Sequence, residues 1–319
     1  MVDRIFIRIA VAIAACLAFS AFAQEFPTRG IRVVMPVAPG NASDILGRIY
    51  ADELTKLVKQ TVVVDNRPGA GGDIAAAEVA HASPDGYTLL FGTTSVFAGN
   101  RWLFPRTTFD QDRDLFPISL FAQTPLLLLR GPNLAGKSLQ DVIAMAKASA
   151  KPFAIGSSAT VYSVLFGLFR EASGAPFLLV PYKASAQSLI DLHKNDIQLM
   201  IEAANTGAPL LGSDSRLGAL AVTSAQRLEV LPNVPTLKES GIDVVFGGWN
   251  LIAGPRGMPA QVIQTLNQAT NAITRNPDVR KRMASLSTEM LGGTPEDAAR
   301  RVQADGRRFG DMITRFNLK

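Results

Sequence analysis

The sequence predicts an α/β protein, because short apolar runs typical of buried strands alternate with segments of helical periodicity. The run IRVVMP at 31–36 is apolar at nearly every position, as expected of a parallel strand buried on both faces. A helix should follow, with one apolar face formed by Leu46, Tyr50, Leu54 and Leu57. Repetition of this strand–helix unit indicates mainly parallel sheets flanked by helices.

The expected elements fall into two series that separate near residue 120. The strands of the first series are expected at 31–36, 61–66 and 87–93. Those of the second series are expected at 126–130, 153–157, 177–182, 197–202 and 217–223. The expected helix N-caps are Ser43, Asp73 and Ser138, and two C-terminal helices should begin at Pro259 and Pro295. A chain of 319 residues is long enough to form two such lobes.

The N-terminus has the pattern of a cleaved secretory signal. Arg4 and Arg8 come before an apolar run at 9–19, and the small residues Ala21 and Ala23 precede a polar position. We therefore expect residues 1–23 to be a signal peptide, with cleavage after Ala23 and export to the periplasm. A retained anchor is disfavoured because the apolar run is shorter than the roughly 20 residues that span a bilayer.

The single cysteine, Cys16, lies inside this expected signal. Residues 13–16 resemble a lipoprotein cleavage box, but the residues after Cys16 stay apolar where a lipidated protein usually has a polar tether, which favours cleavage after Ala23. Removal of 1–23 would leave no disulfide, no thiol nucleophile and no cysteine-bound metal.

Enzymatic, metal and nucleic-acid functions have little support in the sequence. His81 and His193 stand apart from each other and from any cysteine, so no metal site and no cofactor are expected. No G-x-S-x-G motif or nucleophile–base pair is visible, which argues against an enzyme. The net charge is +5, and the arginines at 300–308 alternate with acidic residues, as in a solvated helix face rather than a nucleic-acid interface.

The segment GPNLAGKS at 131–138 matches the phosphate-binding pattern G-x-x-x-x-G-K-S. A phosphate cradle needs a row of backbone N–H donors, and Pro132 removes one of them. An exported protein also meets almost no nucleoside triphosphate. We therefore interpret the match as a strand–helix connection without nucleotide hydrolysis.

The loops after three expected strands are rich in small and hydroxyl residues. In open α/β sheets, ligands bind beyond the carboxyl ends of the strands, and helix N-termini there offer free N–H groups to anions. Three such loops at successive strand ends predict an anion site. The loops are VAPGNASD at 37–44, GTTS at 92–95 and GSSAT at 156–160.

Several stretches resemble the extracytoplasmic solute receptors of the tripartite tricarboxylate transporter family, also called Bug receptors after the Bordetella uptake genes. The runs NRPGAGG and PDGYTL are especially distinctive of these receptors. The similar stretches lie in the family's order along nearly the whole chain after the signal. They are 31–48, 62–93, 180–202, 217–242 and 276–302.

The resemblance implies a two-lobed periplasmic-binding-protein fold of type II, with the ligand cleft between the lobes. The first lobe would comprise 24–122 and 249–319, and the second would comprise 123–248. A monomeric receptor would capture a small organic carboxylate and deliver it to the membrane permease subunits of a tripartite transporter. A ligand sensor that docks on a membrane signalling protein would have the same fold and site, so the two functions stay open at this point.

The resemblance also implies which residues line the cleft. In the first lobe these are Pro39, Gly40, Ser43 and Asp44, with Thr93 and Ser95 in the third loop. In the second lobe they are Ser157, Ser158, Thr160, Tyr182, Lys183, Ser185 and Glu202.

This chain departs from the family pattern at positions that bear on the ligand. Asn41 and Ala42 replace glycines of the first loop, and Val161 and Tyr162 follow a lobe-two loop that is about two residues shorter than usual. Glu202 stands where aspartate is frequent. If Glu202 faces the cleft ionised, it would repel a second carboxylate and favour an amine or a hydroxyl. The alternative is a partly solvated residue at a strand end.

Overall fold

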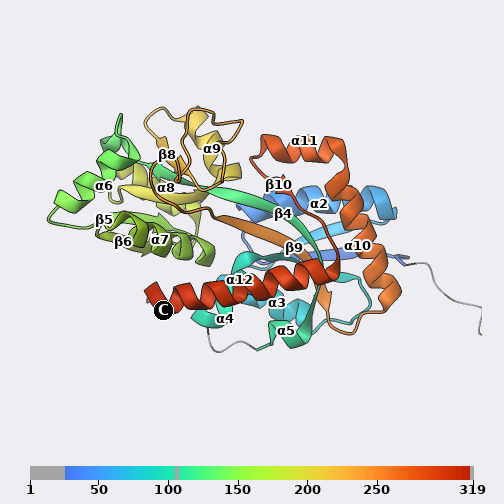
Figure 1. Ribbon diagram of the computed structural model, residues 1–319. Helices are drawn as coiled ribbons and strands as arrows, with labels where there is room; N and C mark the ends of the chain where they lie inside the picture. The colour runs from blue at the N-terminus through green and yellow to red at the C-terminus, as the bar shows by residue number, and fades with distance from the viewer. Residues whose placement is uncertain (1–25, 105–107, 317–319) are drawn as a thin grey trace, which may run out of the picture.

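A computed structural model describes residues 26–104 and 108–316, and shows an elongated α/β molecule made of two lobes (Figure 1). The expected signal peptide, its cleavage after Ala23 and Cys16 lie outside the described residues. A 10-stranded sheet runs through both lobes in the order β2-β1-β3-β9-β4-β7-β5-β6, with β10 and β8 each paired to β4. The α/β class predicted from the alternation of apolar runs is confirmed.

The first lobe contains a parallel set of strands, β2-β1-β3. Strand β9 continues this set antiparallel to β3. The strands are β1 (Ile31–Met35), β2 (Val62–Asn66), β3 (Thr88–Thr93) and β10 (Glu289–Met290). The helical segments are α2 (Ala42–Val58), η1 (Ala70–Gly72), α3 (Asp73–Ala80), η2 (Ser95–Gly99), α4 (Asn100–Leu103), α5 (Gln111–Asp114), α10 (Ala260–Arg275), α11 (Pro277–Ser285) and α12 (Pro295–Phe316).

The second lobe contains the parallel set β7-β5-β6, covered on both faces by helices. Its strands are β5 (Phe153–Ser157), β6 (Phe177–Pro181), β7 (Leu199–Ala203) and β8 (Gly218–Val222). Its helical segments are η3 (Pro132–Leu134), α6 (Leu139–Ala148), α7 (Thr160–Ser173), α8 (Ser185–Lys194) and α9 (Ala204–Ser213). Ser138 caps α6 in a reciprocal capping box with Asp141, as the sequence predicts.

Two long antiparallel strands, β4 (Leu115–Arg130) and β9 (Gly247–Pro255), join the lobes (Figure 1). Strand β4 pairs with β9 and β10 in the first lobe and with β7 and β8 in the second. The sequence predicted only its apolar C-terminal end, 126–130, because Pro117 and polar residues interrupt the part before it. The predicted lobe boundaries after 122 and 248 fall inside these two strands, and the division at those residues stays a prediction.

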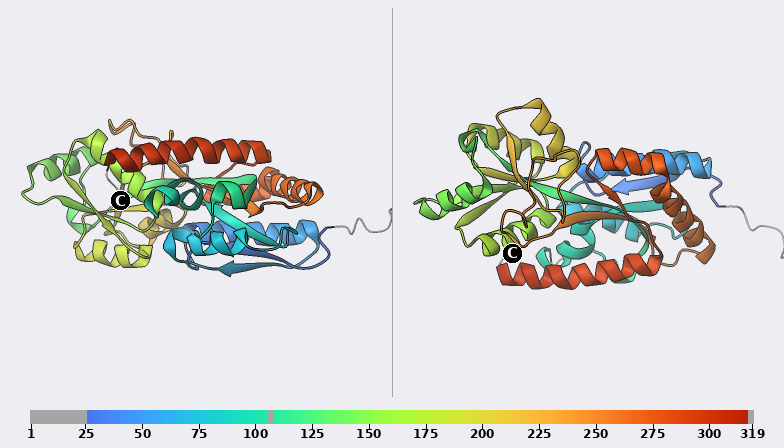
Figure 2. Two further views of the ribbon diagram at one scale, coloured as in Figure 1. Left: turned by 90° about the horizontal axis from the view of Figure 1, so that it is seen from below. Right: turned by 45° about the horizontal axis from the view of Figure 1, so that its top comes forward.

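Helix α12 runs along the first lobe and ends on the second (Figures 1 and 2). In the first lobe, Trp102 Nε1 donates to the carbonyl oxygen of Gly306 at 2.9 Å. At the other end, Phe316 lies against Gly167 of α7, where even an added Cβ would meet its ring. An ion pair between Arg315 and Glu171 of α7 adds to this contact. The C-terminal helix therefore forms a third connection between the lobes, beside β4 and β9.

Within the described ranges, the structure contains no helix with both the length and the apolar character that a bilayer crossing requires. The first-lobe core packs Tyr50 of α2 on Phe91 and Phe121 of the sheet, with ring centroids 6.1 and 5.3 Å from the tyrosine. In the second lobe, Phe166 and Phe169 of α7 are buried against the sheet. Each lobe therefore has apolar packing around its own part of the sheet.

Candidate functional site

The first loop of the candidate site connects β1 to α2. The Asn41 side chain accepts a hydrogen bond from Ser43 N at 3.0 Å and caps α2, so the predicted cap at Ser43 is wrong by two residues. Asparagine is an equally good cap and comes earlier in the chain. The Ser43 hydroxyl instead accepts a hydrogen bond from Asn250 Nδ2 of β9 at 3.1 Å. Ser43 therefore ties the first loop to a connecting strand.

Asp44 holds the shape of this loop. Its carboxylate accepts hydrogen bonds from Gly40 N at 2.8 Å, Arg48 Nε at 2.9 Å and Asn66 Nδ2 at 2.8 Å. Burial favours the neutral acid, but these three donors outweigh burial and lower the pKa of Asp44. Gly40 adopts φ +79°, a conformation that suits glycine and lets its N–H reach the carboxylate. Asp44, predicted as a ligand contact, thus uses both oxygens to position the loop.

We expect Asp44→Ala to destabilise the protein because three donors around a buried site would lose their acceptor. The loss should be about 2–3 kcal/mol, lowering Tm by about 4–12 °C. Since the folded-state pKa of Asp44 is lowered, its contribution is complete above the ordinary aspartate pKa and disappears as pH falls through the lowered value. The Tm difference from the wild type should therefore narrow below about pH 4.

Asp52→Ala is the matched control, since Asp52 is exposed on the same helix. It should change Tm by less than about 2 °C. Equal Tm losses for the two variants, measured by thermal unfolding over a pH series, would contradict the role of Asp44.

The third loop follows β3. Thr93 Oγ1 accepts a long hydrogen bond of 3.4 Å from Val96 N, and Ser95 is buried at the start of η2. The sequence missed Thr94, whose hydroxyl donates to Trp249 O at 3.0 Å and accepts from Trp249 N at 2.6 Å. This loop, like the first, is therefore anchored on β9.

Three helices of the second lobe begin at the same edge of the sheet. Helices α7, α8 and α9 follow β5, β6 and β7, which are parallel neighbours, so their carboxyl ends meet. Their N-cap residues are all alanine, Ala159, Ala184 and Ala203, and none provides a side-chain cap. The backbone N–H groups in the first turns are therefore not satisfied by capping side chains. Such groups, together with the helix dipoles, attract a negatively charged ligand.

Hydroxyl groups of the predicted set lie between these helix ends. Ser158 Oγ and Ser185 Oγ are 2.9 Å apart, which joins the α7 loop to the start of α8. The Ser157 hydroxyl donates to Ala159 O at 3.3 Å and helps to shape the same loop. Thr160 is the first residue of α7. The structure thus brings together the serines that the sequence placed at separate strand ends.

Of three other predicted contacts, one bonds to the protein itself and two are exposed to solvent. The Tyr182 hydroxyl donates to Asp191 Oδ2 of α8 at 2.8 Å. Burial, followed by the hydrogen bond to Asp191 and then by its charge, raises the pKa of Tyr182 to about 12. Lys183 is exposed to solvent. Pro39 is also exposed, in the first loop. Tyr182 therefore supports α8, and its hydroxyl is not a free donor.

Glu202 is buried at the end of β7, only 2% exposed, so the expectation of a partly solvated residue does not hold. Its Oε1 accepts from Ala203 N at 3.0 Å and from the Thr206 hydroxyl at 2.6 Å. Burial raises the pKa of this carboxyl, although Ser185 and Thr206 favour the ionised form. Tyr162, buried nearby, has a pKa well above its ordinary value because of burial and then of the Glu202 charge.

The two lobes touch through a residue that sequence analysis missed. Asn205 Nδ2 of α9 donates to the carbonyl oxygen of Ala42, the first residue of α2, at 3.1 Å. The start of α9 therefore meets the start of α2 across the interface between the lobes. A polar residue in the first turn of a helix carries no distinctive sequence signal, whereas Asn250 could have been suspected from its place in the apolar strand 249–253.

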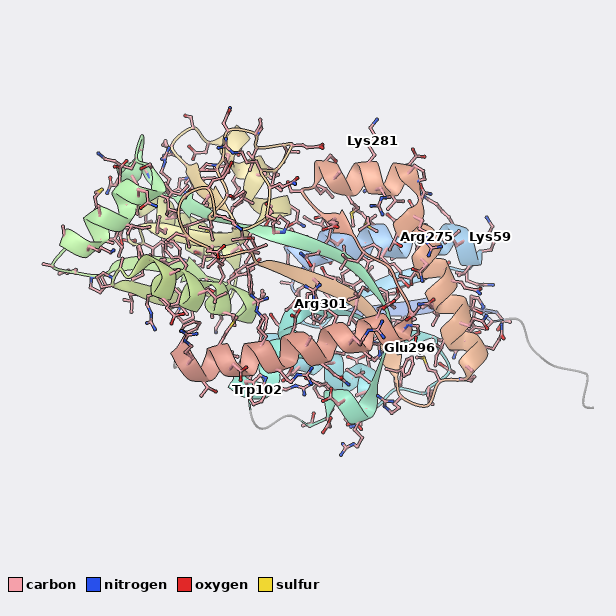
Figure 3. The ribbon with its side chains drawn as sticks, in the orientation of Figure 1. Lys59, Trp102, Arg275, Lys281, Glu296 and Arg301 are labelled. Atoms are coloured by element: carbon pink, nitrogen blue, oxygen red, sulfur yellow. The ribbon has the colours of Figure 1, made fainter. Side chains whose placement is uncertain are left out.

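Among the described residues, the space between the lobes includes a smaller and a larger cavity that no residue of the predicted set lines. One of about 220 Å³ lies between α9 and residues 285–287. The other, about 630 Å³, borders β4, residues 224–229 and α11. Lys281 of the larger cavity points away from the body of the protein (Figure 3). No three His, Cys, Asp or Glu side chains gather as a metal site in the part of the chain that the structure describes.

A family model described as the tripartite tricarboxylate transporter family receptor, TctC, matches residues 46–318. The chain belongs to this receptor family. TctC receptors are periplasmic substrate-binding proteins and not enzymes. The resemblance identified from the sequence is thereby confirmed, together with the two-lobed binding-protein fold.

Named relatives agree with this membership. The receptor is 31% identical over 302 residues to Protein BugT of Bordetella pertussis, covering 93% of this chain and 92% of BugT. Rpa4515 of R. palustris with adipate has a TM-score of 0.87 and 31% identity, covering 92% of this chain and 99% of that one. MatC from Rhodopseudomonas palustris with bound malate has a TM-score of 0.80 and 27% identity, covering 90% and 100%.

Proposed function

We propose that this receptor captures a small organic carboxylate between its two lobes and delivers it to the membrane subunits of a tripartite tricarboxylate-type transporter. The observation that carries the proposal is the meeting of three helix N-termini without side-chain caps at one edge of the second-lobe sheet. A carboxylate there would accept hydrogen bonds from N–H donors that no capping side chain uses. The adipate of Rpa4515 and the malate of MatC are ligands of the same chemical class.

The ligand would lie against the first loop on one side and the serines of α7 and α8 on the other. Charge-assisted hydrogen bonds contribute roughly 1.5–3 kcal/mol each, so three or four of them could support micromolar binding, about −8 kcal/mol. Pro39, Gly40, Ser43, Thr93, Ser95, Ser157, Ser158, Thr160, Lys183 and Ser185 remain proposed contacts. Asp44 and Tyr182 would act by positioning their loops.

Binding would favour the state in which the lobes are closed. A ligand that touches both lobes stabilises that arrangement by its differential affinity for it. The hydrogen bond from Asn205 to Ala42 is a direct contact between the two lobes, and it would stabilise the same closed arrangement. We propose a monomer that opens and closes about β4 and β9.

The test is a thermal-unfolding screen of the protein purified from the periplasm of expressing bacteria. N-terminal sequencing of this material should begin at Gln24 if the signal is cleaved as predicted. A ligand at about 100 times its Kd should add roughly 2.7 kcal/mol and raise Tm by several degrees. Stabilisation by mono-, di- or tricarboxylates is expected. Stabilisation only by sugars, nucleotides or metal ions would contradict the proposal.

Delivery of the ligand to the membrane transporter requires a separate measurement. Cells that lack the gene should lose import of the radiolabelled acid identified in the screen and regain it when the gene is restored. Normal import in the deletion strain would contradict the transport role while leaving ligand binding intact.

A further inference from the structure

The buried carboxyl of Glu202 is only partly satisfied by the protein. Its Oε1 has two donors, Ala203 N and the Thr206 hydroxyl, and the nearby Ser185 hydroxyl also favours the ionised carboxyl. Oε2 is buried, and no described donor reaches it with normal hydrogen-bond geometry. Buried polar atoms without partners are uncommon in folded proteins. The free Oε2 therefore marks a place where a donor is missing.

The protein also supplies no positive charge to balance this carboxyl. Among the described residues, no lysine, arginine or histidine forms an ion pair with Glu202. The titratable side chain that influences it from α7 is Tyr162, which is buried and neutral. The neighbouring groups on α8 and α9 are the hydroxyls of Ser185 and Thr206. A buried carboxylate without a cation costs several kcal/mol, so its partner must be a proton or a cation from outside the chain.

This carboxyl lies beside the anion-attracting helix ends. Glu202 precedes the N-cap of α9, and its neighbour Ser185 is the first residue of α8. Through the pair Ser185 and Ser158, it is linked to the loop before α7. The second lobe therefore presents a fixed carboxyl, negatively charged when ionised, next to a group of backbone donors. A ligand complementary to both has a carboxylate and a positively charged donor close together.

We propose that the ligand is an amino acid or a related acid with a protonated amine, and that its ammonium group donates to Glu202 Oε2 while its carboxylate binds the helix N-termini. This inference rests on the proposed function and narrows its ligand class. An ammonium group supplies both the missing donor and the missing charge. A dicarboxylate would place a second negative charge against Glu202.

The experiment compares acids that differ only by the amine. Isothermal titration of the wild-type protein would use aspartate with succinate, glutamate with glutarate, 4-aminobutyrate with butyrate, and phenylalanine with 3-phenylpropanoate. In each pair that binds, the amine-bearing member should bind at least about 10-fold more tightly, the ratio expected of one hydrogen bond between charged groups.

Glu202→Gln is the diagnostic variant. Glutamine can keep the acceptor that Ala203 N and Thr206 use, and it puts an amide N–H where Oε2 stands. The preference for the amine should therefore fall by at least about 10-fold. Because burial raises the pKa of Glu202, the variant should unfold at the same Tm as the wild type or higher without ligand. Asn205→Ala is the control, which should weaken both members of a pair equally.

Three outcomes would overturn the inference. One is equal or tighter binding of the acids that lack an amine. Another is an unchanged amine preference in Glu202→Gln. Either of these two results would leave the proposal of a carboxylate receptor standing. The third outcome is that no carboxylate binds, with or without an amine, and it would overturn the proposed function as well.

Discussion

We expect Ser158→Leu combined with Ser185→Leu to weaken carboxylate binding at least 100-fold. The two hydroxyls lie 2.9 Å apart between the first turns of α7 and α8, and both side chains are half-buried. Leucine removes the hydroxyls and covers the backbone donors of both turns. The loss of two charge-assisted hydrogen bonds, at roughly 1.5–3 kcal/mol each, corresponds to at least about two powers of ten in Kd.

Isothermal titration with the ligand found in the screen measures this effect. Ser213→Leu is the matched control, because Ser213 is exposed at the opposite end of α9. Its Kd should equal that of the wild type. Unchanged binding by the double variant, with normal unfolding in the absence of ligand, would place the carboxylate away from α7 and α8.

The largest loss of stability is expected from Trp249→Ala. Trp249 is 1% exposed on β9, and its indole donates to Asp305 of α12 at 2.7 Å. Arg301 binds the same carboxylate and also reaches Gln123 of β4, on the side of α12 that faces the connecting strands (Figure 3). Truncation leaves a cavity where β4, β9 and α12 meet. We expect a loss of about 3–5 kcal/mol and a Tm lower by about 6–20 °C.

Trp102→Ala provides the comparison, because Trp102 also donates to α12 but is 38% exposed. Its Tm loss should be less than half of that for Trp249→Ala. Thermal unfolding followed by circular dichroism measures both variants. Similar losses of Tm for the two variants would show that the packing of Trp249 between β4, β9 and α12 has no special part in stability.

The sequence predicted the fold class well because each buried parallel strand is a short apolar run, such as 31–36 or 197–202. The same apolar runs showed where each strand ends and therefore placed the serines at those ends. The parallel order of the strands then brings the ends together. It misplaced the cap of α2, where Asn41 and Ser43 are both good capping residues and only the geometry of the loop selects one.

Contacts between distant segments could not be predicted. The burial of Glu202 depends on α8 and α9 closing over the strand end, and the bond from Asn205 to Ala42 joins residues that are 163 positions apart. The role of Asp44 similarly depends on Asn66 from β2. Local sequence patterns contain no information about such long-range partners.

The position of β9 between β3 and β4 has a consequence for the order in which the chain folds. Until residues 247–255 are in place, β3 has no partner on that side, and its apolar segment 88–93 stays an open edge. The second lobe is mostly complete by then, because its strands and helices lie before β9 in the chain. We therefore expect the second lobe to fold first. The first lobe must wait for the last quarter of the polypeptide, and its exposed edge makes that interval the most vulnerable to aggregation.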